Sequence, residues 1–122
     1  MYIIPENIDL SKFLLNPITE ISYTLSTINI MFENYHYYIQ LYGPFNIKTN
    51  NKYIECTEIY PIKCDFELIQ LIGKMIVNVE VNSDRDILSF TFEDNILLNL
   101  ISSEYYESFR IFMNKEEIVI WK

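Results

Sequence analysis

Apolar and polar residues alternate along residues 75–112, and this alternation constrains the fold more than any other feature of the chain. Apolar runs recur there between short polar segments, and residues 118–121 add a further run at the end. A period of two places successive side chains on opposite faces of an extended backbone, which is typical of half-buried β-strands. Because Asp94 and Asn95 tolerate the positive φ of a tight turn, residues 87–92 and 96–98 are predicted to form a β-hairpin.

The N-terminal part of the chain carries the same kind of pattern. Strands are predicted at residues 18–25, 28–32 and 37–41, with weaker candidates at 45–48 and 53–60. The sequence therefore predicts a mainly β (α+β) protein, built from antiparallel meanders that pack as a sandwich or a partly open barrel.

Two short segments have helical rather than strand spacing, at residues 7–15 and 65–73. The apolar residues with this spacing are Leu10, Phe13 and Leu14 in the first segment and Phe66, Ile69 and Ile72 in the second. Asp9 or Asn7 can cap the first helix, and Gly73 is suited to end the second. We therefore expect one or two short helices beside the sheets.

The two halves of the chain resemble each other, so we predict one domain, residues 1–122, that contains an internal duplication of about residues 10–48 and 66–113. The run at 28–34 matches the run at 88–94, and residues 37–41 match 96–100 after a one-residue slip in the turn. The alternative is that β-meanders of similar length look alike by chance.

The composition restricts the classes of function. The chain has 122 residues, half of them hydrophobic, and a net charge of −8. This charge disfavours nucleic acid and favours a basic protein partner. Two glycines are too few for a phosphate-binding loop, and two cysteines with one histidine are too few for a structural zinc site unless carboxylates complete it, so no cofactor or metal is predicted. Without a secretory signal or a membrane span, we expect a cytoplasmic protein with Cys56 and Cys64 as buried thiols.

The ten tyrosines and their acidic neighbours are the most informative candidates for binding. Tyr37 and Tyr38 are adjacent on a predicted strand, so both cannot face the core. Exposed tyrosine is common in interface hot spots, although it is also a good strand former at the edge of a core. The predicted partner-binding residues are Tyr35, Tyr37, Tyr38, Glu33, Glu93, Asp94, Glu104, Tyr105, Tyr106 and Glu107.

No set of residues in the sequence is typical of an active site. His36 is the only histidine, and a general base would need an orienting carboxylate and a nucleophile beside it. Paired acids such as Glu104 with Glu107, or Asp84 with Asp86, adjoin turns and are expected to be solvated. We therefore predict a protein that is not an enzyme.

Three short motifs resemble those of small bacterial β-domains of unknown function: residues 71–76, the strand and turn at 88–94, and the block Tyr106-Glu107-Ser108-Phe109. The resemblance covers roughly residues 10–121. Some acidic domains of this kind are encoded beside toxins and look like immunity proteins. The resemblance implies a fold and a binding role, and it implies no catalytic residue.

The leading hypothesis is therefore an immunity protein that neutralises a cognate bacterial toxin by binding its basic surface. One rival hypothesis is a structural or adaptor β-domain that associates with itself, as a homodimer for example, through an edge strand such as residues 118–121. Another is an enzyme or small-ligand binder with a pocket near His36.

Overall fold

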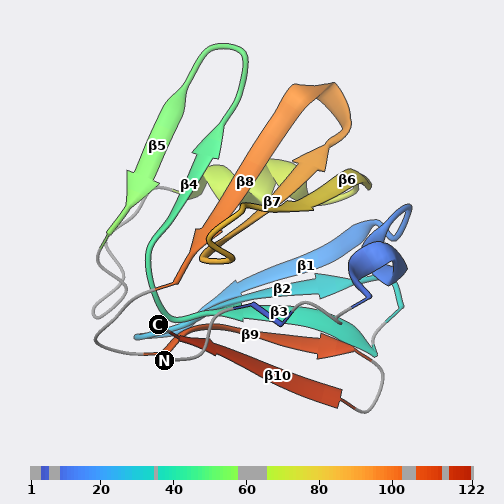
Figure 1. Cartoon of the computed structure of the whole chain (residues 1–122). Coiled ribbons are helices and arrows are strands. Elements are labelled where there is room, and N and C mark those ends of the chain that lie inside the picture. The colour runs from blue at the N-terminus through green and yellow to red at the C-terminus, as the bar shows by residue number, and fades with distance from the viewer. Residues whose placement is uncertain are drawn as a thin grey trace.

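The computed structural model describes residues 4–5, 9–34, 36–57, 66–102, 107–113 and 116–121, with side chains described throughout except at 66, 67, 107, 116 and 118–121. Two antiparallel sheets of five strands each face one another as a sandwich that does not close into a barrel (Figure 1). The mainly β fold predicted from the alternating pattern is confirmed, and of the two architectures proposed the sandwich is the one observed.

Each sheet combines strands from both halves of the chain. Across sheet A the order is β1 (Ile18–Tyr23), β2 (Ile28–Phe32), β3 (Tyr37–Leu41), β9 (Glu107–Met113) and β10 (Glu116–Trp121). Across sheet B it is β5 (Tyr53–Cys56), β4 (Phe45–Lys48), β8 (Ile96–Ile101), β7 (Ile87–Phe92) and β6 (Ile76–Val81). The 3-10 helices in the described ranges are η1 (Leu10–Phe13), η2 (Phe66–Leu71) and η3 (Glu93–Asn95).

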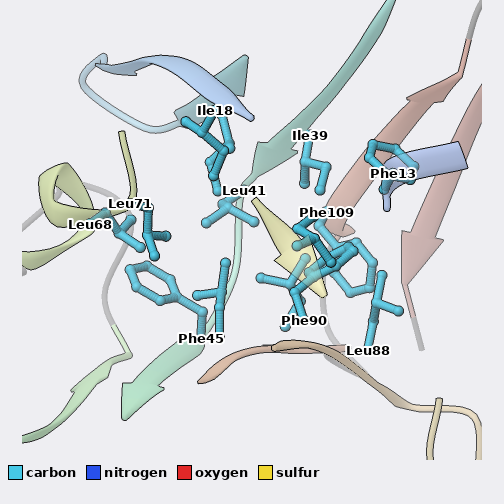
Figure 2. Packing of buried hydrophobic residues seen from close by; sticks show 14 of the residues in the cluster. Phe13, Ile18, Ile39, Leu41, Phe45, Leu68, Leu71, Leu88, Phe90 and Phe109 are labelled. Carbon is cyan, nitrogen blue, oxygen red and sulfur yellow. The ribbon is translucent and has the colours of Figure 1, made fainter. Parts of the chain in front are cut away.

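The core lies between the two sheets and is built by the alternating residues. In β2 the buried positions are Ile28, Ile30 and Phe32, and in β7 they are Leu88, Phe90 and Phe92. Figure 2 shows Phe13 of η1 and Leu68 and Leu71 of η2 in the same cluster as these inner residues. Burying each such side chain contributes roughly 1.5–3 kcal/mol, which is the main favourable term in folding.

The short helices bury only some of the residues that helical spacing indicated, namely Leu10 and Phe13 in the first segment. Leu68 and Leu71 are buried, whereas Ile69 and Ile72 are half exposed. Because a 3-10 helix has three residues per turn, Leu68 and Leu71 lie on one face of η2 and Ile69 lies on another, and Ile72 follows the end of the helix. The same spacing buries Leu10 and Phe13 in η1 and leaves Leu14 exposed.

The two halves share one order of a 3-10 helix and five strands, with η1 and β1–β5 in the first and η2 and β6–β10 in the second, and the second half adds η3 between β7 and β8. We call two residues equivalent when they hold the same place in the strand registers of the two halves. Ile28 pairs with Leu41 as Leu88 pairs with Leu100. The first strand of each half carries a bulge at the same place, after Ile18 in β1 and after Ile76 in β6. The duplication as an event in the history of the chain stays a prediction.

Each half builds three strands of one sheet and then crosses to the other sheet, where β4 pairs with β8 and β9 pairs with β3. The first crossing passes through Gly43. The backbone N–H groups of Tyr42 and Gly43 both donate to the carbonyl oxygen of Ser108, at 2.8 Å each. A Cβ atom at position 43 would lie 3.0 Å from the Cα of Ser108. The two backbone segments are therefore too close for a side chain to fit between them without a shift.

We predict that Gly43→Ala lowers the free energy of unfolding by about 1–3 kcal/mol, because the added methyl group pushes apart two hydrogen-bonded backbones. Urea denaturation of the purified protein measures this. Gly73→Asn is the control, since Gly73 has φ +87° and nothing lies within 4 Å of an added Cβ, and asparagine tolerates positive φ. An unchanged urea midpoint for Gly43→Ala would contradict the prediction.

Candidate surface for partner binding

The edge strands β1 and β6 begin side by side, where residues 14–18 and 72–76 meet. Leu15 N–H donates to the carbonyl of Ile76 at 3.0 Å, and Gly73 N–H donates to the carbonyl of Ile18 at 2.7 Å. Ile18 N–H also donates to the carbonyl of Lys74 at 3.1 Å. We call these two segments the junction. It ties the edge of one sheet to the edge of the other.

Exposed apolar side chains gather at the junction and beside it. Among the described residues, seven large hydrophobic side chains are exposed, and five of these belong to this region. They are Leu14, Leu15, Ile69, Ile72 and Val77. The other two, Leu25 and Tyr53, lie in the β1–β2 turn and in β5. Scattered apolar residues on a surface need no explanation, but a gathered set of them is typical of a contact surface.

Leu15 is the least expected of these residues. Its side chain is 68% exposed, and its backbone has φ 60°, in the left-handed region that large side chains avoid. The equivalent position in the second half is Gly73, which has φ +87°. The backbone here therefore suits glycine, and the first half carries an exposed leucine instead. A residue that adds strain and little burial is a candidate for a functional role.

Acidic side chains border the junction. Glu33 N–H donates to the carbonyl of Pro17, and at the equivalent place Glu93 N–H donates to the carbonyl of Met75. Glu93 also accepts from the N–H of Met75 at 2.8 Å through its Oε1. Three of the predicted binding residues, Glu33, Glu93 and the adjacent Asp94, are therefore found beside the apolar set.

The one ion pair described at the junction joins Lys74 Nζ to Asp94 Oδ2 at 2.7 Å. This hydrogen bond raises the pKa of Lys74 above its usual value. The Asp94 side chain remains 74% exposed, so it is open to a further partner. The pair is therefore a surface pair with little effect on stability.

Tyr37 and Tyr38, the two predicted tyrosines that the structure describes, lie in β3. Tyr37 points inward, with its ring 5.6 Å from the ring of Phe13 in an edge-to-face contact. Tyr38 points outward from sheet A and stacks on Phe112, with ring centroids 4.0 Å apart and planes at 8°. The expectation that Tyr37 and Tyr38 face opposite sides is thus confirmed, and neither of these two tyrosines lies in the junction segments.

Tyr35, Glu104, Tyr105 and Tyr106 lie outside the described residues, as does the side chain of Glu107. His36 is exposed in the β2–β3 turn, where its backbone N–H donates to Asn34 Oδ1 at 3.2 Å.

Within the described ranges, no group of three or more histidines, cysteines or acids could hold a metal ion. None of the described helices has the length and hydropathy of a membrane span.

Comparison with known proteins adds no assignment. No protein-family model, curated protein or solved structure significantly matches the chain.

The exposed apolar set at the junction was not predicted. Leu14 and Ile72 were each predicted to lie on the apolar face of a helix, but both follow the last residue of their 3-10 helix. The sequence does contain a signal for this exposure. The segments that form η1 and η2 are short and carry more apolar residues than one helix face can bury. The pair Leu14-Leu15, directly before a Pro-containing turn, fits no strand alternation.

Asp9 fixes the start of η1 and so the approach to the junction. Its Oδ1 accepts from the backbone N–H of Ser11 at 3.1 Å and from the Ser11 hydroxyl. The hydrogen bond from the Ser11 hydroxyl has the larger effect, and together with the bond from the Ser11 N–H it lowers the pKa of Asp9 below its usual value of 3.8. A carboxyl whose pKa is lower in the folded state adds stability above its unfolded pKa, and this stability is lost as the pH falls through the folded value.

We therefore predict that Asp9→Ala lowers the urea midpoint at about pH 7 and that the difference from the unaltered protein shrinks as the pH falls below 3.8 and through the lowered pKa of Asp9. The measurement is urea unfolding of both proteins across this range. If the same difference persisted at low pH, the charged cap would not be its cause.

Proposed function

We propose that this chain is a non-enzymatic binding protein that recognises a basic protein partner through the junction. The observation that carries the proposal is Leu15, an exposed leucine with φ 60° at a position whose equivalent is glycine. Its conformation opposes folding, and its side chain buries little in the isolated chain. A partner that covers this side chain would supply the burial that the isolated chain lacks.

The surroundings of Leu15 support a basic partner. The apolar set is bordered by Glu33, Glu93 and Asp94, and Lys74 is the only base within the two junction segments. With a net charge of −8 over the chain, the long-range field also attracts cationic proteins. In such an interface the apolar centre supplies the affinity, and the acidic border supplies orientation and association rate.

The partner class we propose is a bacterial toxin domain with a basic surface, which would make this chain an immunity protein of the cytoplasm. Small size and acidity support this proposal, since a compact acidic domain can cover a cationic active-site region. It remains a proposal about the identity of the partner, separate from the proposal about the surface.

The binding surface is tested by Leu15→Asn, with Leu25→Asn as the matched control. Both leucines are exposed, at 68% and 64%, but Leu25 lies in the β1–β2 turn at the far end of β1. Because asparagine tolerates positive φ, Leu15→Asn is expected to keep or slightly raise the melting temperature. It should weaken the complex about tenfold or more, as truncation of an interface anchor does.

The partner for this titration is recovered by tagged capture from the native host and identified by mass spectrometry. Titration calorimetry with the purified partner then compares the two variants at low and high salt. If both variants weaken the complex equally, or if neither variant weakens it, the junction is refuted as the contact surface. Recovery of this chain alone would favour the self-associating structural domain.

The toxin proposal has a separate test in cells. We expect the recovered partner to arrest growth when expressed alone, and co-expression of this chain to restore growth. Co-expression of the Leu15→Asn variant should restore it less well, and Leu25→Asn should restore it fully. A partner that does not affect growth would refute the toxin proposal and leave the binding surface in place.

A further inference from the structure

The outer face of sheet A carries one continuous row of apolar side chains. The strand registers place Met31 beside Tyr38 and Tyr38 beside Phe112. All three are half-buried and alternate with the core residues of β2, β3 and β9, so they face away from the sandwich. Tyr38 and Phe112 stack face to face, with centroids 4.0 Å apart. The stacked pair makes this row an aromatic strip on the outer face of sheet A.

A glutamate ends this row on each side. Glu20 of β1 pairs with Met31, and Glu117 of β10 pairs with Phe112. Both glutamates are exposed. With neighbouring strands about 4.8 Å apart, the two carboxylates stand roughly 19 Å from each other, with the aromatic strip between them.

Sheet B provides an internal comparison, because equivalent positions there have the same place in the same fold. The equivalent row crosses the sheet from Asn78 in β6 to Tyr53 in β5, and its members are Asn78, Thr91, Leu97, Lys48 and Tyr53. This row has no acid and one base, whereas the row on sheet A has two acids and no base. The fold therefore does not require an aromatic strip with acidic ends.

The acids of sheet B stand in a different setting. Glu55 and Glu80 end the neighbouring row, whose central members are polar. There Ser89 donates to Asn99 at 2.5 Å, and Asn99 donates to Asn46 at 2.7 Å. These side chains satisfy one another, so the combination of aromatic rings with acidic ends is confined to sheet A.

The same face of sheet A already holds one guanidinium between a ring and a carboxylate. The Cζ of Arg110 lies 5.3 Å from the centre of the Tyr42 ring, and its Nη1 donates to Glu117 Oε1 at 2.9 Å. Planar guanidinium groups stack on aromatic faces and bind carboxylates through a fixed fork of donors. The intramolecular contact shows that this surface can hold an arginine side chain.

We propose that the outer face of sheet A is a second binding site, and that it takes an arginine-bearing extended segment of a protein partner. An arginine of that segment stacks on the Tyr38–Phe112 pair, and flanking basic residues reach Glu20 and Glu117. A strip of roughly 19 Å matches about six residues of extended chain, at about 3.3 Å per residue. The inference does not depend on the junction, which lies at the starts of β1 and β6.

The probe is a fluorescein-labelled oligoarginine peptide of about six residues, with oligolysine of equal length for comparison. Fluorescence anisotropy measures its affinity for the purified chain and two variants. Tyr38→Leu installs the residue type that sheet B carries at the equivalent position, Leu97. Tyr53→Leu makes the same substitution in the equivalent row of sheet B, where Tyr53 donates to Glu55 at 2.7 Å.

We expect Tyr38→Leu to weaken oligoarginine binding about fivefold, a loss within the range measured for cation–π contacts. Tyr53→Leu should leave the affinity unchanged, and oligolysine should bind the unaltered chain more weakly than oligoarginine. Equal affinity of oligoarginine for both variants would overturn the proposal, because general acidity would then account for the binding.

A second measurement needs no variant. In NMR titrations of the unaltered chain, oligoarginine should shift the ring protons of Tyr38 and Phe112 and leave those of Tyr53 unshifted. Shifts confined to residues outside sheet A would overturn the proposal. Leu15→Asn should bind oligoarginine as the unaltered chain does, so failure here and failure of the junction proposal give different results.

Discussion

The exchange of strands between the two halves is the constraint on which the rest of this structure depends. Each half supplies three strands to one sheet and two to the other, so neither half completes a sheet alone. The crossing at Gly43 is possible because two backbones approach there without an intervening side chain. The core forms only when both halves are in place, and we infer from this that the chain folds as one cooperative unit.

Most of the fold could be predicted because its main signal is local. Alternation over 28–32 and 87–92 specifies which residues of these strands face inward, and both segments form strands as predicted. The exchange of β4 and β9 between sheets could not be predicted, because alternation specifies a buried face and not the sheet that covers it. The one-residue slip between the turns after Phe32 and Phe92 was visible in the sequence and is present in the registers.

The candidate surface was less predictable, and the reason is physical. Leu14 and Ile72 are apolar, and sequence patterns assign apolar residues to a core. Each lies just past the end of a 3-10 helix whose buried residues are spaced by three, after Phe13 in η1 and after Leu71 in η2. The acids Glu33, Glu93 and Asp94 could be identified because a charged side chain is expected at the surface whatever the local backbone structure. Their place beside the junction follows from hydrogen bonds between residues distant in sequence, which no local pattern encodes.

Equivalent positions in the two halves separate what the fold requires from what it tolerates. The bulges after Ile18 and Ile76 occur in both halves, so they belong to the architecture, where they twist the edge strands and disfavour pairing with other chains. Leu15 differs from its equivalent Gly73, and Tyr38 differs from its equivalent Leu97. Neither burial nor backbone geometry requires the residue that the first half carries. In each pair the residue of the first half is the one that exposes or stacks a large apolar side chain. These two departures from symmetry therefore lie at residues that we propose contact another molecule, whereas the shared bulges belong to the architecture of the sandwich.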